Sequence, residues 1–167
     1  MTRIIAVDWS GDSRNAATKI WVAEVSPGGA IVRLECGRDR HSTAEWLIRQ
    51  AARPERLIVG LDFAFSLPAW YLRERALTSA PDLWALADRE AEGWLLKCEQ
   101  PFWGRPGKKK PMLPEHRPHF RRTEDAAPST GGIRPKSVFQ IGGAGAVGTG
   151  SLRGLPVLHR LRNAGFS

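Results

Sequence analysis

The order of apolar segments in the first part of the chain limits the fold more than any other feature of the sequence. Residues 3–10 (RIIAVDWS) are apolar for most of their length, as expected for a central strand that is covered on both faces. Residues 19–25 and 30–36 predict two further strands. The Ser-Pro-Gly-Gly stretch at 26–29 predicts a tight turn, so these two strands are expected to form an antiparallel hairpin.

A helix and another strand follow the hairpin. Residues 41–53 have helical spacing, and Ser42 with Glu45 fits a capping box at the helix start. Residues 56–68 (RLIVGLDFAFSLP) return to a strand pattern. The predicted order is therefore β-β-β-α-β, and the strand after the crossover helix is expected to lie parallel to a neighbour.

The second half of the chain is predicted to be helical around an irregular insertion. Helices are expected over 68–77 and 81–98, and the second has one buried face formed by Trp84, Ala87, Ala91, Trp94 and Cys98. Residues 99–136, with seven prolines and a triple lysine, predict an irregular basic insertion.

The last part of the chain is expected to return to regular structure. Residues 137–141 (SVFQI) predict a strand, and a glycine-rich loop follows at 142–151. A helix is expected over 155–165, with Gly165 as its C-cap. The chain is expected to form one α/β domain over residues 1–167.

Composition narrows the class of protein. An apolar fraction of 42% with seven tryptophans is that of a globular protein. The sequence has no run of eighteen apolar residues and no signal-peptide layout, so we expect no membrane span. Cys36 and Cys98 are too few for a disulfide framework, which favours a cytoplasmic location. The oligomeric state is left open.

The net charge of +8 is concentrated in the second part of the chain. Residues 1–98 hold 13 basic and 13 acidic residues, whereas residues 99–136 hold nine basic and four acidic ones. This distribution favours a phosphate-rich partner such as DNA or RNA, although a solvated surface explains charge alone equally well. Within the insertion, Lys108, Lys109, Lys110, Arg121 and Arg122 lie among aromatic residues, a mixture that suits single-stranded nucleic acid.

Two aspartates form the central candidate site. Asp8 ends the first strand, and Asp62 lies near the end of the strand expected beside it. If these strands are parallel neighbours, both carboxylates emerge at the same carboxyl edge of the sheet, where ligands bind in open α/β sheets. Two close carboxylates repel each other unless a cation lies between them, so the pair predicts a catalytic Mg²⁺ or Mn²⁺ site for phosphodiester chemistry. The alternative is that each aspartate only caps the turn after it.

Three stretches carry a resemblance to a known family. They are IIAVDWSGD (4–12), VGLDFAFSLP (59–68) and PKSVFQIGGAGAVGTGSLRG (135–154). They resemble a bacterial family of unknown function whose members are predicted ribonuclease H-like nucleases. The resemblance implies a ribonuclease H-like mixed sheet flanked by helices, and metal-dependent nuclease activity with Asp8 and Asp62 as catalytic residues. Members of that family usually run on further, so the chain is expected to lack a C-terminal part.

A third carboxylate is not obvious in the sequence. Ribonuclease H proper carries a glutamate on the helix after the third strand, and Glu45 occupies the first turn of the corresponding predicted helix. The capping box already explains that residue. Asp12 is close to Asp8 in sequence, but its position in a loop favours solvation.

The glycine-rich stretch has two interpretations. Gly143, Gly145 and Gly148 match G-x-G-x-x-G, but later glycines and Pro156 interrupt the helix that a dinucleotide site needs. A phosphate-binding loop remains, and its residues would be Gly143, Gly145, Thr149, Ser151 and Arg153. A tightly packed connection that requires small residues is the equal alternative.

Two other classes of function stay open at this point. Actin-like ATPases and sugar kinases share this sheet topology and pair a strand aspartate with Mg-nucleotide, but the second glycine-rich turn and the duplicated domain of that class are absent here. A non-catalytic nucleic-acid-binding module is the other class.

Overall fold

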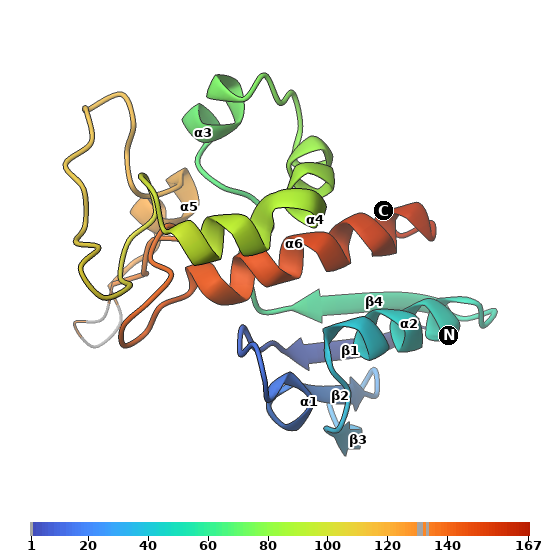
Figure 1. The fold of residues 1–167 in the computed structure, drawn as a ribbon. Coiled ribbons are helices and arrows are strands. Elements are labelled where there is room, and N and C mark those ends of the chain that lie inside the picture. The colour runs from blue at the N-terminus through green and yellow to red at the C-terminus, as the bar shows by residue number, and fades with distance from the viewer. Residues whose placement is uncertain (1, 130–131, 133) are drawn as a thin grey trace. The chain divides into compact units, whose positions relative to one another are not determined.

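The computed structural model describes residues 2–129, 132 and 134–167. They form two compact units, one made of the residues up to Phe63 together with Val157–Ser167, and the other of Ala64–Pro156. The elements in chain order (Figure 1) are β1 (Thr2–Asp8), α1 (Ala16–Lys19), β2 (Trp21–Val25), β3 (Ile31–Glu35), α2 (Arg40–Ala51), β4 (Arg56–Leu61), α3 (Ala69–Glu74), α4 (Ala80–Lys97), α5 (Arg122–Ala126) and α6 (Gly148–Asn163).

The first unit is built on a four-stranded mixed sheet with the order β3-β2-β1-β4. β1 pairs antiparallel with β2 and parallel with β4, and β2 pairs antiparallel with β3. The β-β-β-α-β order and the parallel fourth strand are confirmed, and the chain is an α/β protein. The predicted hairpin is also confirmed, because Gly29 closes its turn with a hydrogen bond to Ser26 O (2.9 Å) and a φ of +85°.

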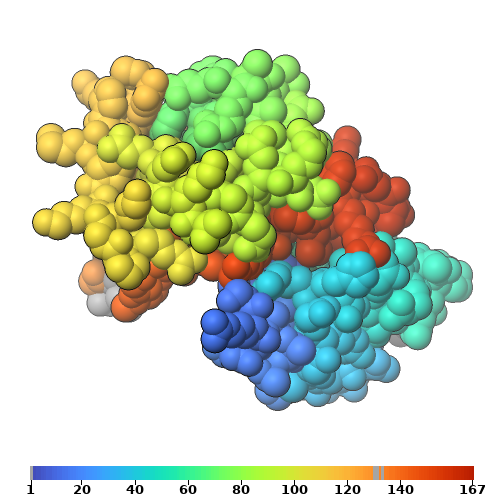
Figure 2. Space-filling model, in the orientation of Figure 1, coloured from blue at the N-terminus to red at the C-terminus, as the bar shows by residue number. Residues whose placement is uncertain are grey.

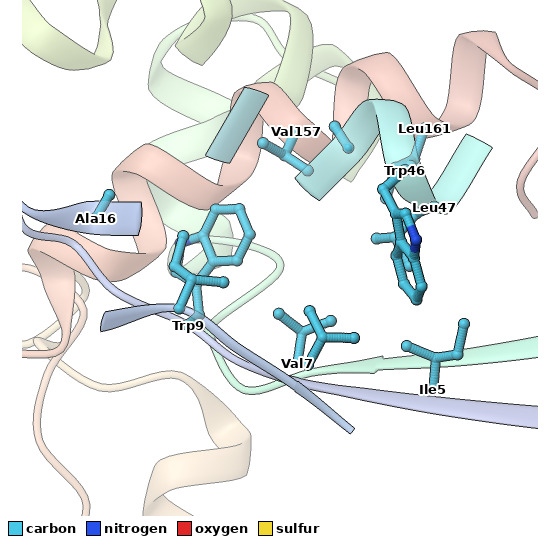
Figure 3. Close-up of a cluster of buried hydrophobic side chains, with 11 residues drawn as sticks. Ile5, Val7, Trp9, Ala16, Trp46, Leu47, Val157 and Leu161 are labelled. Atoms are coloured by element: carbon cyan, nitrogen blue, oxygen red, sulfur yellow. The ribbon is translucent and has the colours of Figure 1, made fainter. Parts of the chain in front are cut away.

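One face of this sheet carries the core of the first unit. Ile5 and Val7 of β1 are 0% and 2% exposed, and they pack with Trp46 and Leu47 of α2 and with apolar residues near the end of α6 (Figure 3). Ala6, which alternates with them along β1, is exposed. The expectation that β1 is covered on both faces is therefore wrong, since its alternating burial is that of a strand with a single covered face.

Helix α2 begins earlier than the sequence pattern predicted. Its N-cap is Asp39, whose carboxylate accepts a hydrogen bond from Ser42 N (2.8 Å). The predicted Ser42–Glu45 capping box is thus wrong, because Asp39 occupies the cap and places Glu45 inside the helix. The preceding loop also contains the short helix α1, which the sequence pattern did not predict.

The second unit contains α3, α4, α5 and the beginning of α6. The start of α4 is confirmed, because Ser79 and Asp82 form a reciprocal capping box with a proline in the first turn. The buried face of α4 differs from the prediction. Leu83 and Leu95 are buried with Ala87, Ala91 and Cys98, whereas Trp84 and Trp94 lie half-buried and donate their indole N–H groups to Phe65 O and Glu90, respectively.

An aromatic cluster forms part of the core of the second unit. Tyr71 is fully buried and contacts Trp70, Trp94, Phe102 and Phe139, with ring centroids 5.6–6.0 Å apart. Burial of its hydroxyl raises the pKa of Tyr71. The hydroxyl thus stays un-ionised at neutral pH.

The region from 137 to 151 departs from the prediction. Residues 137–141 form a turn with one parallel bridge, Trp103 to Gln140, instead of a strand. Helix α6 starts at Gly148, within the segment expected to be a loop, and ends two residues before Gly165, whose φ is +96°. The C-terminal position of Gly165 is as predicted.

Close backbone approaches explain much of the glycine content of this region. A Cβ atom on Gly142 would overlap the backbone of Gly104, and one on Gly104 would overlap Gly142. A Cβ on Gly148 would overlap the carbonyl oxygen of Val138. At these positions the glycines allow segments to pack closer than any side chain permits.

The packing role of Gly148 leads to a stability test. Gly148→Ala is expected to lower the free energy of unfolding by about 1–3 kcal/mol, because backbone must move to admit the methyl group. The matched change Gly93→Ala, inside α4 with open space around the new Cβ, is expected to raise it by about 0.5–1 kcal/mol. Urea unfolding measures both, and equal effects of the two changes would contradict the packing role.

Candidate metal centre

The two aspartates singled out in the sequence lie at the same edge of the sheet. Val7 of β1 is in register with Leu61 of β4, and the two strands run parallel. Asp8 and Asp62 are the next residues along each chain segment, so both leave the sheet at its carboxyl edge. This is the edge at which ligands bind in open α/β sheets.

A backbone hydrogen bond fixes the Asp62 side chain. The N–H of Trp9 donates to Asp62 Oδ1 over 2.6 Å. The Trp9 ring itself is only 9% exposed and packs in the core of the first unit, 5.0 Å from the ring centre of Phe63 (Figure 3). The buried ring thus anchors the backbone amide that orients the carboxylate.

The two carboxyl groups interact with each other. Partial withdrawal from water raises the pKa of Asp62, the charge of Asp8 raises it further, and the Trp9 N–H opposes both effects. A hydrogen bond from one side chain to the other when one of them is protonated would raise the pKa of Asp62 further. The two carboxyl groups therefore affect each other's ionisation.

The donor set of the pair suits a hard divalent cation. Mg²⁺ in proteins is commonly held by one or two carboxylates, while water and substrate phosphate oxygens complete its coordination. A like-charged pair with a raised pKa is the arrangement that such a cation would relieve. Among the described residues, no group of three or more His, Cys, Asp or Glu side chains could hold a metal ion.

The other candidate acids have partners of their own. Glu45 forms an ion pair with Arg160 of α6 and a second, longer one with Arg49 (3.8 Å). Asp12 accepts hydrogen bonds from two backbone N–H groups in its own loop and from Lys19 Nζ (2.6 Å), and these contacts lower the pKa of Asp12. Both carboxylates thus have local structural roles.

Arg40 is a neighbour of the site that the sequence pattern did not indicate. Its guanidinium Nη1 donates to Ser10 O (2.9 Å) and Asp12 O (2.8 Å), and so ties the loop after Asp8 to the start of α2. An arginine in the first turn of a helix gives no sign in the sequence that it will reach back to a loop near residue 10.

The predicted phosphate-binding residues of the glycine-rich stretch are engaged locally. Thr149 donates to Ile141 O (2.8 Å), and Ser151 is 1% exposed, donates to Val147 O and accepts from Ala64 N. Arg153 makes two hydrogen bonds to Glu92. Gly143 and Gly145 adopt positive φ angles of 80° and 70°. Their phosphate role stays a prediction, and each of these contacts fits a packed connection.

The basic insertion belongs to the second unit and shows on its surface (yellow to orange in Figure 2). Lys108, Lys109 and Lys110 are exposed. Arg121 instead forms an ion pair with Glu124, and Arg122 is exposed at the beginning of α5.

Comparisons with protein-family models, with curated proteins and with solved structures gave no match. Within the described ranges, no helix has both the length and the apolar character needed to cross a membrane.

The raised pKa of Asp62 predicts how stability depends on pH. Asp62 ionises near its ordinary pKa of 3.8 in the unfolded state and at a higher pH in the folded state. Between these two pKa values the folded state binds more protons than the unfolded state, so the free energy of unfolding falls as the pH rises. Asp62→Asn keeps an oxygen acceptor for Trp9 N–H and removes the ionised form. We expect this variant to have a higher Tm than the wild type at pH 7 in EDTA, with the gap closing below pH 3.8.

Thermal unfolding followed by circular dichroism across this pH range measures the gap. Asp39→Asn is the opposite-sign control: asparagine still caps the helix, but the Ser42 hydrogen bonds lower the pKa of Asp39, so this change should not raise Tm at pH 7. A wild-type protein that is more stable than Asp62→Asn at pH 7 would contradict the raised pKa of Asp62.

Proposed function

We propose that the chain is a metal-dependent nuclease that hydrolyses phosphodiester bonds of nucleic acid at the Asp8–Asp62 pair. The observation that carries the proposal is the meeting of these two carboxyl groups at the carboxyl edge of the sheet, with the pKa of Asp62 raised. The resemblance to ribonuclease H-like nucleases supports it, since that resemblance implies acids on the first and fourth strands. β1 and β4 deliver Asp8 and Asp62 in that way.

Asp8 and Asp62 would hold Mg²⁺ or Mn²⁺ between the chain and a substrate phosphate. When bound there, the ion would polarise the phosphodiester and lower the pKa of an attacking water.

The residues of the chain prepare the pair for this task. Trp9 N–H donates to Oδ1 of Asp62, which restrains the carboxylate. Arg40 anchors the carbonyl groups of Ser10 and Asp12, so the loop that follows Asp8 has a fixed path. A preorganised pair loses less conformational entropy when it binds a cation.

Cleavage of labelled nucleic acids tests the proposal. Single-stranded DNA, duplex DNA and RNA are incubated with the purified chain in Mg²⁺, in Mn²⁺ or in EDTA. We expect cleavage of at least one substrate with metal and none in EDTA. Asp8→Asn and Asp62→Asn should each lose about 100-fold or more, because even outer-shell changes at metal sites cost 10- to 100-fold.

Asp39→Asn, purified in the same way, controls for a contaminating nuclease and should retain the wild-type rate. Equal rates in wild type, Asp8→Asn and Asp62→Asn would contradict the proposal. Mg-dependent ATP hydrolysis without nucleic-acid cleavage would assign the same pair to a phosphotransferase of the actin and sugar-kinase type instead.

A further inference from the structure

The second unit contains a pocket that is distinct from the aspartate pair. Its volume is about 560 Å³, within the range of small-molecule sites. All of the residues that line it belong to the second unit. Those that bear on its chemistry are Trp103, Lys110, Phe120, Arg134, Lys136 and Gln140.

The charge of this pocket is entirely positive among the described residues that line it. Lys110, Arg134 and Lys136 contribute three cations, and no carboxylate accompanies them. Over the described chain, none of the three has a carboxylate within ion-pair distance. Arg121 of the same insertion, by contrast, has an ion pair with Glu124. Three cations around one cavity repel each other, and an anion would relieve that repulsion.

Two aromatic rings accompany these cations. Trp103 and Phe120 both line the pocket; Trp103 is 8% exposed and Phe120 is half-buried. The Lys110 ammonium lies over both rings, 5.7 Å from the Trp103 centroid and 5.6 Å from that of Phe120. This double cation–π contact holds the charge at the aromatic wall.

Several contacts hold Trp103 in place. Trp103 N donates to Phe139 O (3.0 Å), and Ile141 N donates to Trp103 O (2.8 Å), which fixes the backbone on both sides of the indole. The His119 ring meets the indole edge-on, at 81° and 4.9 Å. A side chain held in place lowers the entropy that a ligand must spend on binding.

Gln140 adds a group that can recognise a base edge. Its Nε2 makes one hydrogen bond, to Gly142 O at 3.3 Å. An amide side chain can donate two hydrogen bonds and accept two, so further capacity remains for a ligand. Amide groups pair well with the donor and acceptor edges of nucleobases.

We propose that this pocket holds one unpaired nucleotide of a single-stranded nucleic acid. The base would stack on Phe120 and meet Gln140, and Lys110, Arg134 and Lys136 would surround its phosphate. Lys108 and Lys109, adjacent in sequence to Lys110 and exposed, would contact neighbouring phosphates of the strand. The volume and the aromatic wall exceed what inorganic phosphate needs, and a paired base cannot enter such a pocket. The proposal does not depend on the activity of Asp8 and Asp62.

Fluorescence polarisation in EDTA tests the pocket apart from any cleavage. The probe is a labelled oligo-deoxythymidine of about ten nucleotides, which suits the site sizes of single-strand-binding proteins. Three variants are compared with the wild type: Phe120→Leu, the double variant Lys110→Gln/Lys136→Gln, and the control double variant Arg73→Gln/Lys97→Gln. The control removes two exposed helix cations of the same unit that lie outside the pocket. Circular dichroism confirms that each variant is folded.

We expect Phe120→Leu to weaken binding about 5- to 100-fold, which is the loss of one base–aromatic stack. The pocket double variant should weaken binding about tenfold or more, and should lower the slope of log affinity against log salt by about 0.7 for each lost phosphate contact. The control variant should bind within about twofold of the wild type, because long-range charge is screened at physiological salt.

Two results with the variants would overturn the proposal: a control variant that weakens binding as much as the pocket variant, or a Phe120→Leu variant with unchanged affinity. Two results with the wild type would also overturn it: a duplex that binds as tightly as the single strand, or a free mononucleotide that binds as tightly as the oligonucleotide. Asp8→Asn and Asp62→Asn should bind the probe as the wild type does. A chain that cleaves nucleic acid but fails these binding tests would refute the pocket alone. A chain that passes them without cleavage would refute the nuclease alone.

Discussion

The parallel pairing of β1 with β4 is the constraint on which the account of the site depends. It sets two carboxylates at one edge of the sheet, where partial burial and then the charge of Asp8 raise the pKa of Asp62. Trp9 stabilises this geometry, because its side chain is buried in the core while its backbone N–H donates to Asp62. Two ionised carboxylates in this geometry lower the stability of the fold. A bound cation would remove that destabilisation, which is typical of functional sites.

The first part of the chain was predictable because local chemistry and fold agree there. The Ser-Pro-Gly-Gly turn, the alternation of strands with one helix, and the two strand-ending aspartates all pointed to the observed topology. The errors have physical causes. The N-cap of α2 is Asp39 and not Ser42. Both residue types cap helices well, so the sequence alone does not show which of them occupies that position. The SVFQI segment has a strand composition but makes a single bridge, to Trp103, because its neighbours in space come from the irregular insertion.

The glycine-rich stretch shows why a motif needs its structural context. Its spacing suggested a phosphate loop, yet Gly142 meets the backbone of Gly104 and Gly148 meets that of Val138. The neighbouring hydroxyl groups of Thr149 and Ser151 are bound to backbone carbonyls. The close approach of Gly142 to Gly104 joins residues far apart in the sequence, so no local pattern could predict it. The only sign in the sequence of the cation-rich pocket around Trp103 was the mixture of lysines and aromatic residues in the insertion. Arg134, Lys136 and Gln140 line the pocket because the fold brings them there.

We expect Asp8 and Asp62 together to bind one divalent cation. Titration calorimetry with Mn²⁺ in a chelator-free buffer near pH 7 measures this binding directly. We expect one ion per chain for the wild type and for Asp39→Asn, and loss of that binding in both Asp8→Asn and Asp62→Asn. Mn²⁺ binding that survives in either of these two variants, or a wild type that binds none, would contradict it.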